Sequence, residues 1–180
     1  MANKAKSDNP TNFDRTNWPL PDEFLLELGR LAALWTSLEA QLDICIGKLA
    51  GFDDLSDPKP FILLHHSTVR QKLDMFSSLC EHQLVHHPNL QRYKEVVSKI
   101  TAAQTSRNRY VHNGMVKSED GKSVEMALGS ARGKLKTSVR TVTIDEIKKV
   151  SVDIADAMRF LHHFVTGHDI PPFWERTPRS

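Results

Sequence analysis

An arginine, an asparagine and a histidine lie close together in residues 107–112, whose sequence is Arg-Asn-Arg-Tyr-Val-His. An arginine guanidinium binds phosphate through a planar fork of N–H donors. A histidine accepts or releases a proton near neutral pH. Arg107, Asn108 and His112 therefore carry side chains suited to chemistry on a phosphodiester. They form the candidate site of a ribonuclease or a nucleotide-binding protein.

The asparagine supplies most of the specificity of this string. With 11 arginines and 9 histidines in 180 residues, an Arg-x4-His spacing is expected about 0.5 times in a shuffled chain. Requiring an asparagine directly after the arginine lowers that expectation to roughly 0.02. The chain contains one such string, and chance spacing is therefore a poor explanation for it.

The string lies near the end of a predicted helix that spans about residues 89–113 and stops at Gly114. The residues predicted to face inward keep the same helical spacing along this helix, but they change from apolar to polar toward its end. In order, the predicted stripe is Leu90, Tyr93, Val97, Ile100, Gln104, Arg107 and Val111. Asn108 and His112, four residues apart, share one face of the helix.

A guanidinium at an inward position needs a counter-charge or a bound anion. In one interpretation, Arg107 binds the phosphate of a substrate, with Asn108 and His112 beside it. In the other, Glu39 on the flank of the first long helix neutralises Arg107, and Asn108 and His112 bond to carbonyl groups at the helix end. The residues leave both interpretations open.

Hydrophobic periodicity and turn residues define the elements that must position this string. Helices are predicted over about residues 21–50, 61–66, 67–83, 89–113 and 143–167. Ser67 is the predicted N-cap of the third of these, and a capping box from Thr143 to Glu146 opens the last. Two β-prone runs at 122–128 and 135–142, joined by a turn at 129–133, predict a hairpin.

The predicted fold is all-α, an up-and-down bundle of four to five helices with a β-hairpin inserted before the last long helix. The bundle domain is expected over residues 20–168, with the hairpin insertion at about 120–142. A disordered N-terminal tail is expected at 1–19 and a C-terminal tail at 169–180.

A helical bundle with Arg-Asn-x-x-x-His near the end of its third long helix resembles the HEPN superfamily. Residues 110–114 (Tyr-Val-His-Asn-Gly) also resemble small bacterial HEPN proteins, and residues 34–39 are similar in a less specific way. The resemblance covers roughly residues 21–167. It implies metal-independent cleavage of RNA, without a cofactor, by a homodimer in which two copies of the motif face each other. The hairpin is not part of the minimal bundle of that family.

The resemblance also implies roles for the motif residues. His112 would act as the acid or base that activates the ribose 2′-OH or protonates the leaving 5′-oxygen. Arg107 would stabilise charge on the phosphate oxygens, and Asn108 would hold His112 or the phosphate. Secondary candidates for substrate contact are Arg109, Glu39, Gln104 and Tyr110. Arg109 could equally be a surface charge, and Tyr110 a packing residue.

Related partners and settings follow from the same resemblance. Dependence on the 2′-OH restricts the substrate to RNA. A toxin or phage-defence role is expected, with an antitoxin or regulatory protein as a possible partner. The alternative is a non-catalytic module of HEPN type that binds a nucleotide or a protein.

Composition and net charge bear on the type of partner and the cellular compartment of the protein. A formal charge of +2 is too small to indicate a nucleic-acid partner. Any attraction to RNA must therefore come from local patches of basic residues. The polar N-terminus lacks a signal peptide, and Cys45 and Cys80 fall inside predicted helices. No apolar run approaches the ~18 residues of a membrane span. We therefore expect a cytoplasmic protein that does not enter the membrane.

Two further patterns have ordinary explanations. His82 and His86 have the spacing of two zinc ligands on a helix, but Gln83 stands where a metalloprotease needs a glutamate, and solvated faces explain the histidines better. The second arm of the hairpin is basic, with Arg132, Lys134, Lys136 and Arg140. It is either an RNA-binding surface or a charged edge that prevents aggregation.

Overall fold

The computed structural model describes residues 18–52, 54, 57–119, 123–130, 136–171 and 175, with the side chains of Ser130 and Lys136 left out. This part of the chain is mostly helical, with a small antiparallel sheet. In chain order its elements are α1 (Asp22–Leu49), α2 (Lys59–Leu64), α3 (Val69–Gln83), the 3-10 helix η2 (Pro88–Arg92), α4 (Tyr93–Val111), β1 (Met115–Lys117), β2 (Val124–Ser130), β3 (Lys136–Val142) and α5 (Ile144–Thr166).

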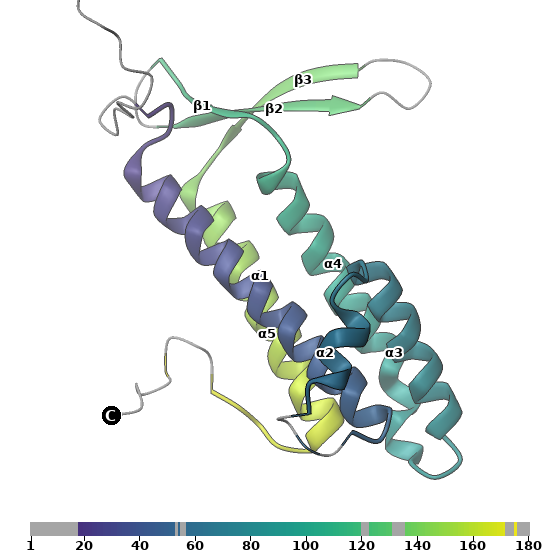
Figure 1. Cartoon of the computed structure of the whole chain (residues 1–180). Coiled ribbons are helices and arrows are strands. Elements are labelled where there is room, and N and C mark those ends of the chain that lie inside the picture. The colour runs from purple at the N-terminus through teal and green to yellow at the C-terminus, as the bar shows by residue number, and fades with distance from the viewer. Residues whose placement is uncertain are drawn as a thin grey trace, which may run out of the picture.

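The long helices form a bundle, and the sheet lies across one end of it (Figure 1). Helices α1 and α5 run side by side along most of their length. Helix α4 returns toward the sheet, with α3 packed against its first half. The candidate site at the end of α4 therefore lies where the bundle meets the sheet. Among the described helices, none combines the length and apolar character needed to cross a bilayer.

The predicted helices are present, with local differences at their ends. Thr68, rather than Ser67, is the N-cap of α3, because the Gln71 side chain reaches back to the Thr68 amide and completes a capping box. At α5, the Thr143 hydroxyl accepts the Glu146 amide as predicted. Gly167 ends this helix with a φ of 73°, a conformation that glycine adopts without steric cost.

The predicted hairpin is part of a three-stranded antiparallel sheet of order β1-β2-β3. Strand β1 was missed because three residues are too short to show a period of two. Val124 pairs with Val142 and Met126 with Arg140, so their shared face packs on the bundle, where both valines and Met126 are fully buried. Gly129 and Ser130, which the sequence placed in the turn at 129–133, belong to β2, and residues 131–135, with Arg132 and Lys134, lie outside the described residues.

The inward stripe of α4 is shifted by one residue at three predicted positions, with Val96, Ala103 and Tyr110 in place of Val97, Gln104 and Val111. The buried residues are Tyr93, Val96, Ile100, Ala103 and Tyr110, whereas Val97 is half-buried and Val111 is exposed. Two adjacent valines satisfy the periodicity equally well, so the pattern could not select between them. Position 107 belongs to both stripes. Arg107 therefore faces inward in either register, as predicted.

Both predicted tails fall largely outside the described residues, which begin at Trp18 and end at 171 apart from Glu175. At the N-terminal side, the Pro19 carbonyl accepts a hydrogen bond from the Lys117 amide at 2.7 Å, which attaches this segment to β1. After α5, the Asp169 carboxylate lies 3.0 Å from His163 Nδ1. The described ends of the chain thus lie against the body.

Candidate functional site

Arg107 is half-buried in the last part of α4, and its side chain reaches toward α1. The guanidinium carbon lies 5.6 Å from the ring centroid of Trp35, a residue that is only 4% exposed. A tryptophan face attracts a cation at this distance because the ring quadrupole is negative above and below its plane. The core of the bundle therefore stabilises a positive charge at this position.

The hydrogen bonds of Arg107 join it to its neighbour in the motif. Nη1 donates to the Asn108 side-chain oxygen at 3.0 Å. Nε is buried and, among the described residues, has no acceptor. Glu39, the predicted alternative partner, is half-buried on α1 but forms no ion pair with Arg107. The interpretation in which Glu39 neutralises Arg107 does not hold in this structure.

His112 is the residue that ends α4, and its ring is exposed to solvent. Its backbone N–H donates to the Asn108 carbonyl at 3.1 Å. Asn108 is thus bonded to Arg107 through its side chain and to His112 through its backbone. The structure brings these three predicted residues together at one helix end, with the guanidinium half-buried and the imidazole exposed.

The secondary candidates divide into exposed and buried residues. Arg109 is exposed, and its carbonyl accepts the Asn113 side-chain amide at 2.7 Å. Gln104 is half-buried, beside the inward stripe instead of in it. Tyr110 is 5% exposed and packs in the core, which favours its alternative role as a packing residue. Burial, reinforced by the nearby Glu146 charge, raises the pKa of Tyr110.

A polar cluster behind Tyr110 ties the sheet to the end of α4. The Tyr110 hydroxyl donates to Glu146 Oε2 at 3.2 Å, and Arg140 of β3 pairs with the same carboxylate. The sequence indicated Glu146 only as a capping residue of α5, and it indicated Arg140 only as part of a basic arm. Arg140 is therefore paired with a carboxylate of its own chain.

The start of the sheet holds the motif from the other side. Strand β1 begins three residues after His112, and the Gly114 carbonyl accepts the Ala127 amide of β2 at 2.9 Å. The short connection from 112 to 115 leaves little freedom to the end of the helix. The sheet, which the sequence did not connect with the motif, therefore helps to fix its position.

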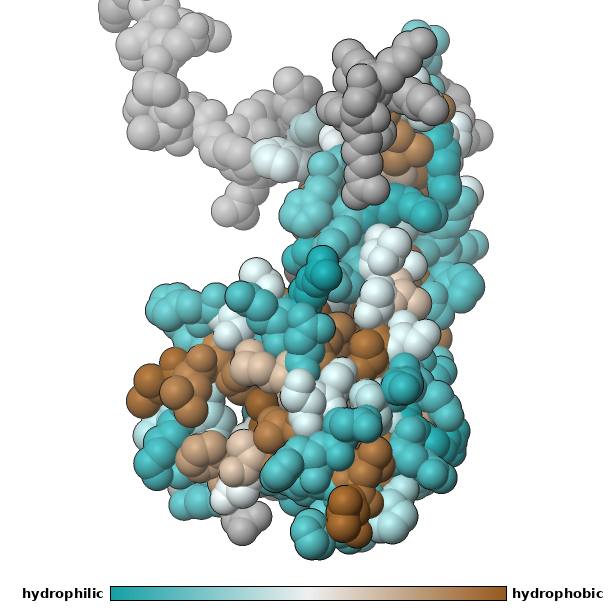
Figure 2. All heavy atoms as spheres, turned by 90° about the vertical axis from the view of Figure 1, so that its right-hand side faces the viewer, coloured by the Kyte–Doolittle hydropathy of each residue, from teal (hydrophilic) through white to brown (hydrophobic). Residues whose placement is uncertain are grey.

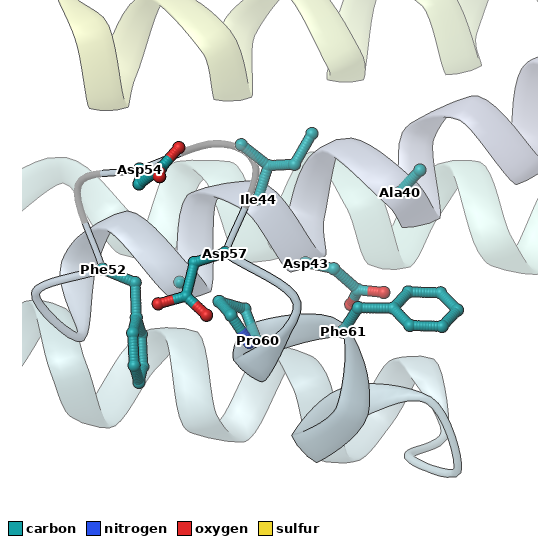
Figure 3. A pocket seen from close by; sticks show the side chains of 9 residues that line it. Ala40, Asp43, Ile44, Phe52, Asp54, Asp57, Pro60 and Phe61 are labelled. Carbon is teal, nitrogen blue, oxygen red and sulfur yellow. The ribbon is translucent and has the colours of Figure 1, made fainter.

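Two hollows in the described part of the chain lie around α2, away from the motif. One, of about 240 Å³, is bordered by Asp43, Ile44, Phe52 and Phe61 (Figure 3). The other, of about 630 Å³, lies between α2 and α3. The exposed side of α2 is apolar, and hydrophobic side chains gather on this side of the lower bundle (Figure 2). Neither hollow is lined by a residue of the predicted site.

The histidine pair at His82 and His86 does not stand on one helical face, because α3 ends at Gln83. Across the described residues, no group of three or more histidine, cysteine, aspartate or glutamate side chains is arranged to hold a metal ion. Solvent-exposed positions therefore remain the simpler explanation for His82 and His86.

Comparisons with protein-family models, with curated proteins and with solved structures found no match to this chain. The resemblance to the HEPN superfamily therefore depends on the motif and on the helical architecture that carries it.

Proposed function

We propose that this protein is a metal-independent endoribonuclease that acts as a homodimer through Arg107, Asn108 and His112. One observation carries the proposal: the Arg107 guanidinium lies at an inward position without a carboxylate partner among the described residues, bonds to the Asn108 side chain, and lies five residues before the exposed His112. A charged guanidinium whose donors are not occupied by a carboxylate is suited to bind a phosphate.

The proposed reaction uses only side chains of the motif. His112 takes the proton of the ribose 2′-OH, whose oxygen attacks the adjacent phosphorus. Arg107 stabilises the negative charge that develops on the phosphate oxygens. The bond from phosphorus to the 5′-oxygen breaks, and this oxygen receives a proton from the His112 of the second copy. The products are a 2′,3′-cyclic phosphate and a 5′-OH, and the need for a 2′-OH restricts the substrate to RNA.

The direct test is cleavage of RNA in the presence of EDTA. We expect the wild-type protein to cut single-stranded RNA and to leave the matching DNA intact, because DNA lacks the attacking hydroxyl. The variants Arg107→Ala and His112→Ala should each lose at least about 100-fold in rate, since each removes one chemical role. Cleavage at wild-type rate by the double variant would identify a contaminant, and no cleavage of varied RNAs by any form would refute the proposal.

A second candidate is a module that binds a nucleotide or RNA without cutting it. The exposed His112 ring has no side-chain partner in the described part of the chain, whereas a catalytic histidine is usually oriented by a second group. Tight binding of RNA that depends on Arg107 but leaves the RNA intact over hours would favour this candidate.

A toxin or phage-defence role, with an inhibitory partner protein, is part of the same proposal. We expect induced expression of the wild-type chain to arrest bacterial growth and expression of His112→Ala to be tolerated. Equal growth of both strains, at equal protein levels, would argue against it.

A further inference from the structure

The inward stripe of α4 contains one charged side chain. Ala103 and Tyr110 on either side of it are buried, and Arg107 occupies the position between them. A charge in such a stripe is unfavourable unless a nearby group stabilises it. Elsewhere in the bundle, the charge of the buried Lys72 is stabilised by the Asp43 carboxylate, which lies 2.7 Å from Lys72 Nζ.

The charge of Arg107 is stabilised by an aromatic ring instead of a carboxylate. Its guanidinium carbon is 5.6 Å from the Trp35 ring centroid, inside the range of a cation–π interaction. Because Trp35 is 4% exposed, packing holds the ring in place and water does not compete for this face. Within the described residues, no carboxylate comes within 4.0 Å of the guanidinium.

A ring and a carboxylate leave an arginine in different states. A carboxylate occupies the N–H donors and cancels the charge, whereas a ring stabilises the charge and takes up no N–H along the guanidinium edge. Nη1 of Arg107 donates one hydrogen bond, to Asn108, and the buried Nε has no acceptor. The guanidinium is therefore charged and short of acceptors, which a phosphate group at its Nη edge would supply.

We propose that Trp35 is a positioning residue of the candidate site. Its ring holds the charged Arg107 guanidinium at the end of α4 so that the free Nη donors bind a phosphate group. Trp35 is too buried to touch the substrate and acts through Arg107. The inference rests on the proposed function for the location of the site, and it adds a residue from α1, a helix far from the motif in the sequence.

The emission of Trp35 offers a direct test. The chain has three tryptophans, and the variant Trp18→Phe/Trp174→Phe keeps Trp35 alone. This variant is titrated with inorganic phosphate, then with a 2′-O-methyl oligoribonucleotide that lacks the attacking hydroxyl. We expect a saturable change in emission that disappears when Arg107→Ala is added. The matched control is Arg70→Ala, on the exposed surface of α3, which should keep the response.

Substitution of Trp35 tests the role of the ring. Trp35→Phe keeps an aromatic face, whereas Trp35→Leu keeps apolar bulk without one. We expect the affinity for the oligonucleotide to fall about five- to twentyfold in the leucine variant and less than about threefold in the phenylalanine variant. Phe24→Leu, a similar loss of a buried ring from α1, controls for reduced packing and should keep the affinity.

Three outcomes would overturn the inference: equal oligonucleotide affinity in folded Trp35→Leu and Trp35→Phe, an equal loss in Phe24→Leu, or an emission response that persists without Arg107. If Trp35→Leu does not fold, as judged by circular dichroism, the emission response and its loss in Arg107→Ala decide the matter. The oligonucleotide cannot be cleaved, so this readout is independent of catalysis. Binding that needs Trp35 and Arg107, without cleavage of RNA, would refute the ribonuclease and leave this inference standing.

Discussion

Burial makes the thiols of both cysteines unreactive. Cys45 of α1 and Cys80 of α3 are free thiols in the core. Desolvation is the main cause that raises the pKa of each thiol to about 12. Since the thiolate is the reactive form, neither cysteine can serve as a nucleophile in the folded protein.

The two thiols predict how stability depends on pH. Above pH 9.0, the unperturbed thiol value, the unfolded chain loses these protons and the folded chain keeps them. The unfolded state then binds fewer protons, so the free energy of unfolding falls with rising pH, by up to about 1.4 kcal/mol per unit for each thiol. Their contribution is fully present below pH 9.0 and is lost as pH rises toward 12.

Urea unfolding under reducing conditions, at several pH values above 9.0, would measure this effect. The double variant Cys45→Ala/Cys80→Ala should show a shallower decline than the wild-type protein. Lysine and tyrosine residues titrate in both proteins, so the difference isolates the thiols. Parallel declines would contradict the raised pKa values.

At the scale of elements, the small sheet acts as a support for the motif. It receives the end of α4 through the short segment from His112 to β1 and pairs Gly114 with Ala127. The Arg140–Glu146–Tyr110 cluster joins β3, α5 and α4 beneath the same end. A helix end that would fray in isolation is thereby held in one conformation.

The contact of α2 with α1 makes a separate prediction. A methyl group at Gly47 would lie 2.8 Å from Cγ of Pro60, a ring that cannot rotate away, whereas a methyl group at Gly29 of the same helix would meet nothing within 4 Å. We expect Gly47→Ala to lower the free energy of unfolding by about 1–3 kcal/mol, because α2 must shift. Gly29→Ala should raise it by up to about 1 kcal/mol, because alanine favours helix.

Denaturant unfolding of the two variants side by side checks this prediction. Because both replace glycine by alanine within α1, Gly29 in its first half and Gly47 in its last turn, both gain helix propensity, and a loss of stability in Gly47→Ala alone reports the Pro60 contact. Equal shifts in both variants would show that α2 adapts without cost.

At the scale of the whole molecule, a single chain offers one Arg107 and one exposed His112. The proposed reaction needs both a base and an acid, and under this proposal a second copy would supply the missing histidine. The net charge of +2 gives no strong long-range attraction to RNA, so binding must come from the local site.

A composite site predicts that one defective copy inactivates the whole dimer. When His112→Ala is co-expressed in excess with the wild-type chain, mixed dimers keep one histidine and lack either the base or the acid, so RNA cleavage should fall in proportion to the share of wild-type chains taken into mixed dimers. Light scattering would verify that the proteins are dimers. A monomeric protein with full activity would exclude the composite site, and mixed dimers that keep half of the wild-type activity would show that each copy acts alone.

The long helices and the inward position of Arg107 follow from local periodicity. The spacing of apolar residues depends only on neighbours three and four positions away, and position 107 faces inward whether Val96 or Val97 is buried. The motif itself, and the shared helix end of Asn108 and His112, could be predicted for the same reason. The three-residue strand β1 could not, since so short a segment acquires its structure by pairing with β2.

The partner of the Arg107 charge depended on the packing of α4 against α1. The sequence offered Glu39 and an external anion as alternatives, and spacing along the chain cannot rank them. In the structure Trp35 lies against the guanidinium, and Glu39 forms no ion pair with it. The spacing of apolar residues shows that a side chain faces inward, but the crossing of two helices determines which side chain it meets.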